Sequence, residues 1–259
     1  AATRPGAALD AALRFAGSLR RTLSPPPAQP SPLLTGRRGV AWRFGVLECP
    51  MDQLKAAGKA GGGSVNDAYV AALLGGLRRY HDSLGTPVDE LPMAMPVSLR
   101  KADDPMGGNR FAGALFAAPV GIADPVERIA TIRGAVLSVK AEPALDTFAV
   151  VAPLLNRLPA LVGVTAFGQL GGAADLSASN LPGVPYPVYM AGARVERVFP
   201  FGPLPGVAIM SGMMSHSGTC CFGINADADA VPDHDLLMGC LREGLDEVLA
   251  LAAPPTEVR

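Results

Sequence analysis

The stretch from Ser64 to His81 constrains the fold more than any other part of the chain. It reads SVNDAYVAALLGGLRRYH. Ser64 followed three residues later by Asp67 is typical of a capping box, in which two side chains satisfy free backbone N–H groups at a helix start. Apolar residues recur at helical spacing, namely Val70, Leu73, Leu74 and Leu77, and the positions around them include five alanines and glycines: Ala68, Ala71, Ala72, Gly75 and Gly76. The sequence therefore predicts a thin, capped helix that other backbones can approach closely.

Around this helix, strand-like and helix-like segments follow one another without strict βαβ alternation. Strands are predicted at 40–48, 91–100, 111–120 and 186–199, and a hairpin at 207–226. Residues 178–185 are predicted to form the end of a strand and the turn that follows it. Helices are predicted at 7–23, 51–59 and 233–251, after the Asp124–Pro125 start signal, and as two or three short buried helices in 147–170. This order indicates an α+β fold, a mixed sheet with helices packed on it.

Two strands carry more specific predictions. In the first, Trp42, Phe44 and Val46 alternate with other residues and therefore share one face. In the second, Pro92 and Pro96 favour an edge position or a bulge, because proline donates no hydrogen bond to a sheet.

The first 30 residues are predicted to form an N-terminal helix and a proline-rich linker, and residues 31–259 the main domain. Prolines crowd residues 24–32 and favour stiff, extended backbone there. The basic pairs Arg20–Arg21 and Arg37–Arg38 lie on either side. We expect these arginines to be solvated, with contact to an anionic lipid headgroup or a phosphate as the alternative.

Composition excludes several classes of function. With 259 residues, 49% of them apolar, the chain can bury a sizeable core, and its net charge of −1 favours no nucleic-acid partner. Its four cysteines match no zinc pattern, so buried thiols are expected and no metal site. There is no apolar run long enough to span a membrane and no signal peptide. Because the chain begins at Ala1, it is expected to be processed, truncated or the observed part of something longer.

No self-contained catalytic centre is visible. The three histidines are His81, His216 and His234, and they fall at a helix end, in a hairpin turn and at the start of the last helix. His81 is expected at a surface helix end, where a cation suits the helix dipole. A G-x-S-x-G elbow, an H-E-x-x-H pair and a phosphate-binding loop are all missing. The residues alone therefore indicate a soluble mixed α/β chain that could form half of a larger unit.

Several segments taken together resemble the C-terminal half of bacterial wax ester synthase/diacylglycerol acyltransferases. They are SPLLTGRRGVAWRF, GGGSVNDAYVAALLGGLRRY, MPVSLR, GGNRFAGALFAAPVGIADPVERIATIR, SNLPGVPYPVYMAGARV and FGINADADAVPDHDLL. Their order covers about residues 31–251. The chain departs from the family pattern at Cys221, where the family often has aspartate, and at Leu181, where it usually has valine.

The resemblance implies a subdomain of the chloramphenicol-acetyltransferase type, so that residues 31–259 would be the C-terminal acyltransferase subdomain. The family's catalytic H-H-x-x-x-D-G motif belongs to an N-terminal half and is missing here. The implied reaction is acyl transfer from acyl-CoA, a substrate and not a cofactor, to a fatty alcohol or diacylglycerol. The alternatives are a non-catalytic acyl- or lipid-binding or complex-forming module, and a carrier-dependent condensation or polyketide-type half. The implied location is cytoplasmic, peripheral to a membrane or lipid droplet.

The resemblance also supplies the candidate site residues. They are Asn66 and Asp67 at the helix start, Ser98 and Arg100 of the proline–valine–serine–x–arginine strand, and Ser179, Asn180, Pro182 and Gly183 of the serine–asparagine–x–proline–glycine turn. Asn66 is the candidate oxyanion donor, since its amide can donate and a helix N-terminus adds positive potential. Asp67 is expected to hold the cap, and Ser179 and Asn180 to fix the turn.

Overall fold

The structure, a computed structural model, describes residues 28–34, 38–98, 111–141, 174–204 and 206–252. The predicted helix at 7–23, the short helices at 147–170 and Arg100 lie outside these residues. The elements are β1 (Trp42–Pro50), α2 (Met51–Ala60), α3 (Val65–Ser83), β2 (Glu90–Ser98), β3 (Phe111–Pro119), α4 (Pro125–Lys140), β4 (Leu176–Leu181), β5 (Tyr189–Met190), β6 (Ala193–Arg194), β7 (Ile209–His216), β8 (Thr219–Asp227) and α7 (His234–Ala250).

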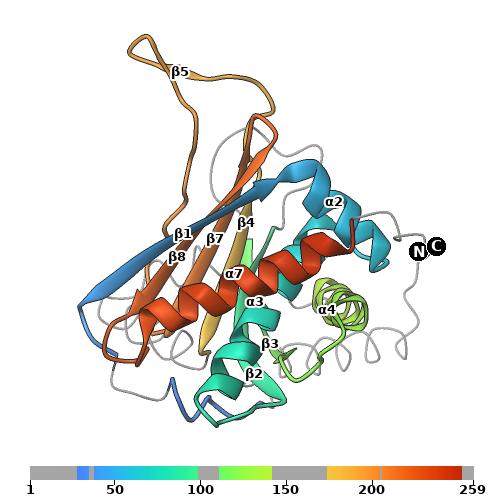
Figure 1. Ribbon diagram of the computed structural model, residues 1–259, viewed down its shortest axis with the longest axis vertical. Coiled ribbons are helices and arrows are strands. Elements are labelled where there is room, and N and C mark those ends of the chain that lie inside the picture. The colour runs from blue at the N-terminus through green and yellow to red at the C-terminus, as the bar shows by residue number, and fades with distance from the viewer. Residues whose placement is uncertain (1–27, 35–37, 99–110, 142–173, 205, 253–259) are drawn as a thin grey trace, which may run out of the picture.

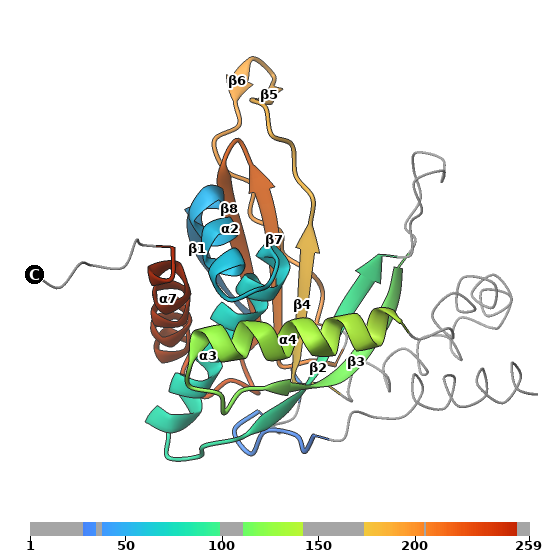
Figure 2. The ribbon, with the colours of Figure 1, turned by 90° about the vertical axis from the view of Figure 1, so that its right-hand side faces the viewer.

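A mixed six-stranded sheet forms the centre of the described fold, in the order β1-β8-β7-β4-β2-β3. Strand β4 runs parallel to its neighbours β7 and β2, and the other pairs are antiparallel. Helices α3, α4 and α7 lie over one face of the sheet (Figures 1 and 2). The predicted α+β class, a mixed sheet with helices packed on it, is confirmed.

Helix α3 begins as its sequence predicts. Ser64 is the N-cap, and both bonds of the capping box to Asp67 are present. Its small residues allow α7 to pack directly against it. A Cβ on Gly244 of α7 would lie 2.4 Å from the Gly76 nitrogen, so only glycine permits this approach. The second predicted start also holds, since the Asp124 side chain accepts from the N–H groups of Val126 and Glu127 at the head of α4.

Two strand predictions are wrong. Strand β2 is not an edge, because it lies between β4 and β3, and no bulge interrupts its pairing with β3. It pairs with β4 only at Met93 and Ala94, so Pro96 falls beyond that contact and costs no ladder bond to β4.

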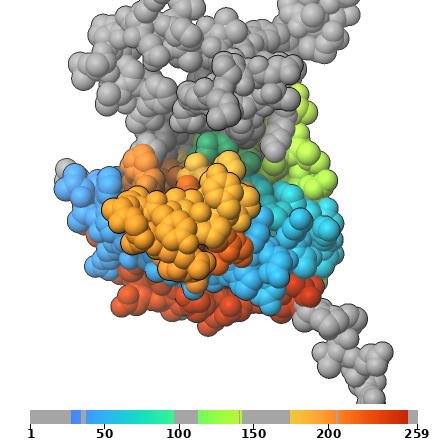
Figure 3. All heavy atoms as spheres, turned by 90° about the horizontal axis from the view of Figure 1, so that it is seen from above, coloured from blue at the N-terminus to red at the C-terminus, as the bar shows by residue number. Residues whose placement is uncertain are grey.

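Instead of the long strand expected at 186–199, the structure has a short hairpin of strands β5 and β6, each two residues long. This hairpin projects from the sheet (Figures 1 and 2). Its turn holds Ala191 and Gly192 at positive φ, and prolines 185 and 187 interrupt the segment before it. Seen from above in Figure 3, the hairpin segment covers the middle of the described surface, with α2 beside it.

The two faces of the sheet differ. The face under the helices carries buried side chains such as Leu47, Phe222 and Met213. On the other face Trp42, Phe44 and Val46 are exposed together, as their alternation predicts, and Phe201 packs edge-on against Phe44 at 5.1 Å between ring centroids. In the part of the chain that the structure describes, no helix has the length and apolarity to cross a membrane.

Candidate functional site

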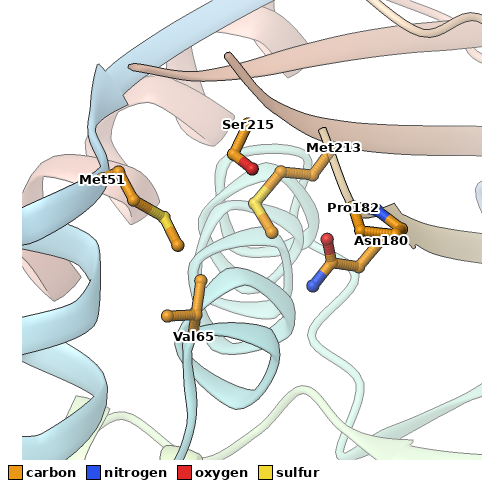
Figure 4. A pocket seen from close by; sticks show the side chains of 6 residues that line it. All are labelled: Met51, Val65, Asn180, Pro182, Met213 and Ser215. Atoms are coloured by element: carbon orange, nitrogen blue, oxygen red, sulfur yellow. The ribbon is translucent and has the colours of Figure 1, made fainter. Parts of the chain in front are cut away.

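A hollow of about 250 Å³ opens at the end of the sheet where β4 and β7 finish and α2 and α3 begin. Its lining residues come from four elements and the turn after β4, and their side chains converge in Figure 4: Met51, Val65, Asn180, Pro182, Met213 and Ser215. Strand register explains part of this convergence. Asn180 of β4 is the partner of Met213 in β7, so both point to the helix-covered face.

Two predicted site residues lie at the helix start beside this hollow, in the turn that begins with Val65. Asn66 is half-buried, and its amide nitrogen lies 3.8 Å from the Met95 thioether sulfur. A thioether is a weak acceptor, so this contact leaves most of the donor capacity of the amide unused. The Asp67 carboxylate is committed, because Oδ2 accepts from both the backbone nitrogen and the hydroxyl of Ser64 at 2.8 Å. Arg133 of α4 adds an ion pair to the same oxygen at 3.7 Å.

The turn after β4 brings three more predicted residues to the same place. Asn180 and Pro182 are exposed and line the hollow. Among the described residues no side-chain hydrogen bond of Asn180 is present, so its amide is not what holds the turn. The backbone holds it instead. A Cβ on Gly183 would lie 1.5 Å from the Ser215 carbonyl oxygen, so glycine is required there, and Ser217 N–H donates to the Val184 carbonyl.

Ser179, the fourth residue of the turn motif, points to the other face of the sheet and contributes through its backbone. The Tyr69 hydroxyl of α3 donates to Ser211 Oγ at 2.7 Å and also interacts with the Ser179 backbone. Tyr69 is fully buried, and this burial raises the pKa of its phenol. The bonds of the Tyr69 hydroxyl to Ser211 and Ser179 fix α3 against β7 and β4, and they hold these two walls of the hollow together.

The remaining predicted pair is not brought to the site by any described contact. Ser98 is the last residue of β2 and pairs with Phe111 of β3. Arg100 lies outside the described residues.

His81 is not at the surface, as its sequence position suggested, but fully buried at the end of α3. Its Nδ1 lies 2.8 Å from the Leu77 carbonyl oxygen and its Nε2 2.7 Å from Ser31 Oγ. A carbonyl only accepts, so Nδ1 carries the proton and Nε2 accepts from the Ser31 hydroxyl. Burial lowers the pKa of this imidazole.

The same cluster contains an ion pair. The Ser31 backbone nitrogen donates to Asp175 Oδ2 at 2.6 Å, and Arg38 forms an ion pair with Asp175 Oδ1 at 3.3 Å. Burial raises the pKa of the Asp175 carboxyl, although Ser31 and Arg38 act in the opposite direction. Arg38 also donates to the carbonyls of Leu34 and Gly206, so it is turned toward the protein and is a poor candidate for a lipid headgroup contact.

None of the three histidines lines the hollow. His216 is buried, with Nε2 2.9 Å from the Val195 carbonyl oxygen, and His234 lies at the start of α7. The four cysteines are all buried and free. Within the described ranges no three His, Cys, Asp or Glu side chains gather closely enough to hold a metal ion. The hollow thus combines amide and hydroxyl groups with apolar walls, and none of the described residues that line it can act as a general base.

Comparison with known families and proteins gives a consistent result. Residues 107–248 match the family described as the WS/DGAT C-terminal domain. A candidate diacylglycerol O-acyltransferase of Mycobacterium tuberculosis is 45% identical over 228 residues, covering 88% of this chain and 46% of that protein. A second one from the same organism is 33% identical, covering 80% of this chain and 44% of its own length. The chain thus spans about half the length of these relatives.

Solved structures share the fold. The wax ester synthase/diacylglycerol acyltransferase from Marinobacter aquaeolei VT8 superposes with a TM-score of 0.64 at 20% identity, over 96% of this chain and 58% of that chain. The nonribosomal peptide synthetase FmoA3 gives a TM-score of 0.62 at 18% identity, over 94% of this chain and 25% of that one. This chain therefore shares its fold with a part of each of these two larger proteins.

Proposed function

This chain belongs to the wax ester synthase/diacylglycerol acyltransferase family, and we propose that it forms the C-terminal half of an acyl-CoA-dependent O-acyltransferase making wax esters, triacylglycerol or both. One observation carries the proposal. The helix start with Asn66 and the turn with Asn180 lie together beside one hollow, and no histidine of this chain lines it. The site is thus equipped to bind and polarise a substrate, while the base must come from elsewhere.

The proposed reaction joins an alcohol oxygen to the acyl carbon of a thioester. A histidine of the N-terminal half, in the H-H-x-x-x-D-G motif of the family, takes the hydroxyl proton as general base. The oxygen attacks the thioester carbonyl, an oxyanion forms, and the C–S bond then breaks to release the thiol of CoA. Acyl-CoA and a fatty alcohol or diacylglycerol are the substrates, and no cofactor is needed in this scheme.

Asn66 of this chain is the proposed oxyanion donor. Its amide nitrogen contacts a thioether, which it can leave at little cost, and it sits in the first turn of a long helix whose dipole is positive at that end. Asp67 has no comparable freedom, since its carboxylate holds the capping box and the Arg133 ion pair.

The N-terminal half is the proposed partner, and an exposed apolar surface supports the presence of such a partner. The apolar group of Trp42, Phe44, Val46 and Phe201 is exposed on the sheet face away from the helices. We also propose a domain boundary near residue 31, so that the buried Ser31 and Leu34 belong to the main domain. We place the assembled enzyme in the cytoplasm, peripheral to a membrane or lipid droplet where its apolar substrates reside.

The decisive experiment assays residues 1–259 with acyl-CoA and either a long-chain alcohol or diacylglycerol, with and without the N-terminal half. We expect no turnover by the chain alone and turnover after the N-terminal half is added. Turnover by this chain alone, abolished by changing His81, His216 or His234, would contradict the two-half account. Binding of acyl-CoA without turnover in the complete assembly would instead favour the non-catalytic, acyl-binding alternative.

A further inference from the structure

We propose that the hollow between β4, β7 and the starts of α2 and α3 holds a segment of an unbranched alkyl chain, with the reacting head of that substrate at its mouth beside Asn66. The inference deepens the proposed function and rests on it. It assigns a binding role to Met51, Val65, Met213 and Ser215, which the sequence does not single out.

The walls of the hollow suit an alkyl chain. Met51, Val65, Pro182 and Met213 present apolar atoms, and none of the six lining residues is charged. Among the described residues, a phosphate or a carboxylate therefore has no charged partner in the lining of the hollow. Two of the four apolar residues are methionines, whose unbranched and polarizable side chains adapt to irregular shapes. At about 250 Å³ the hollow accommodates a short chain segment but not a diacylglycerol as a whole.

Two polar side chains line the hollow and can bind the polar head of the substrate. The Asn180 amide and the Ser215 hydroxyl line the hollow, and neither side chain forms a hydrogen bond with the described residues. Both are at least partly exposed, so water satisfies them in the free protein. A chain whose apolar end fills the space near Met213 would place its ester or thioester end within reach of these groups.

The position of Val65 connects the hollow to the chemistry. Val65 is the first residue of α3 and lines the hollow, and Asn66 is its neighbour in the same helical turn. Met51 on the opposite wall is itself held in place, since its thioether sulfur lies 3.2 Å from the buried Cys220 thiol. The hollow therefore has one wall that leads to the candidate oxyanion donor and another that is packed into the core.

Photo-crosslinking tests the proposal directly. One probe is an acyl-CoA with a diazirine in its acyl chain, and the other is a long-chain alcohol with a diazirine in its alkyl chain. Each is irradiated with this chain assembled with its N-terminal half, and labelled peptides are located by mass spectrometry. We expect labelling at the starts of α2 and α3 and in β7, by the acyl probe if the acyl chain occupies the hollow and by the alcohol probe if the acceptor chain does.

Filling the hollow provides the matched variants. Val65→Phe should lower labelling and kcat/KM for long-chain substrate by about tenfold or more, while Val126→Phe at an exposed position of α4 should change neither. Ser215→Leu fills the same space from β7 and serves if Val65→Phe does not fold by circular dichroism.

The outcomes separate this inference from the proposed function, because release of CoA is measured in the same samples. Turnover without labelling at the hollow, or labelling unchanged by both filling variants, overturns the inference and leaves the proposed function standing. Labelling at the hollow that both filling variants reduce, without turnover, supports the inference and counts against the proposed function.

Discussion

The two ends of α3 contrast in how their polar groups are satisfied. At the C-terminal end, His81 is fully buried and both ring nitrogens have partners at 2.7 and 2.8 Å. At the N-terminal end, Asn66 is half-buried and its amide contacts only the Met95 sulfur among the described residues, at 3.8 Å. A satisfied buried group contributes to stability, whereas a weakly bonded one beside a hollow is available for a ligand. The histidine is thus the structural residue, and the asparagine is the candidate for chemistry.

The polar cluster around His81 nevertheless helps to position the hollow near the other end of α3. Asp175 accepts from Ser31 and precedes β4, so the His81 cluster fixes the beginning of that strand. The far end of β4 carries the turn with Asn180 and Pro182 that lines the hollow. The strand therefore connects a closed polar network at one end to an open site at the other.

The largest expected effect is on catalysis, at the open end. In the complete enzyme, Asn66→Ala should lower kcat by about 100-fold or more, about 2.7 kcal/mol of transition-state stabilisation, with little change in Tm. The matched control is Asn225→Ala, because the Asn225 amide is buried and donates to the Gly202 carbonyl on the other face of the sheet. That variant should lose stability and keep its turnover. A large fall in Tm with near-normal kcat for Asn66→Ala would make Asn66 a structural residue and remove the contrast.

The second effect is on stability, at the closed end. His81→Ala should lower the free energy of unfolding by about 2 kcal/mol, because it leaves the Leu77 carbonyl and the Ser31 hydroxyl without their partner. Activity per folded molecule should remain. Urea unfolding measures the change, and His234→Ala is the control, since His234 Nδ1 is buried without a partner in the described chain. An unchanged free energy of unfolding for His81→Ala would show that the cluster does not hold the fold.

The third effect belongs to the cap of α3. Ser64→Ala removes the side chain that accepts from Asp67 N–H and should cost about 1 kcal/mol of stability. Because the cap sets the position of the first turn, kcat should fall by less than in Asn66→Ala. A loss of activity as large as that of Asn66→Ala, at unchanged Tm, would show that the cap residue acts in the chemistry itself.

Local signals were readable from the sequence, and long-range ones were not. The capping box at Ser64, the Asp124–Pro125 start and the shared face of Trp42, Phe44 and Val46 depend on residues a few positions apart, and all three are confirmed. The place of β2 between two strands depends on pairing with β4, more than 80 residues later in the sequence, and two prolines suggested the opposite.

The site residues also divide into those with a local sequence signal and those that only the folded structure brings together. The resemblance pointed to Asn66 and the turn at Asn180, but Met51, Met213 and Ser215 carry no local signal. Strand parity alone would have placed residues 213 and 215 on one face, yet the register that sets Met213 opposite Asn180 exists only in the folded sheet. His81 was misplaced for a related reason, since its partner Ser31 lies 50 residues earlier.

The smallest expected effect is on the pH dependence of stability, and it follows from the buried His81 at the C-terminal end of α3. Burial lowers the pKa of His81 below its ordinary value near 6.5, so between these two values the unfolded chain binds the proton and the folded chain does not. Stability from this group is therefore present above pH 6.5 and is lost as the pH falls. Between pH 7.5 and 6 the contribution of His81 to the free energy of unfolding should therefore decrease.

Asp175 acts in the opposite direction, because its raised pKa lets the folded state keep a proton that the unfolded state releases. The measurement must therefore isolate His81, and the difference between the urea-unfolding free energies of the wild type and His81→Ala does so at each pH. That difference should shrink from pH 7.5 to 6. A difference that stays flat or grows on acidification would mean that the buried imidazole takes up its proton without leaving its partners, and the closed end of α3 would then be a titrating site like any surface histidine.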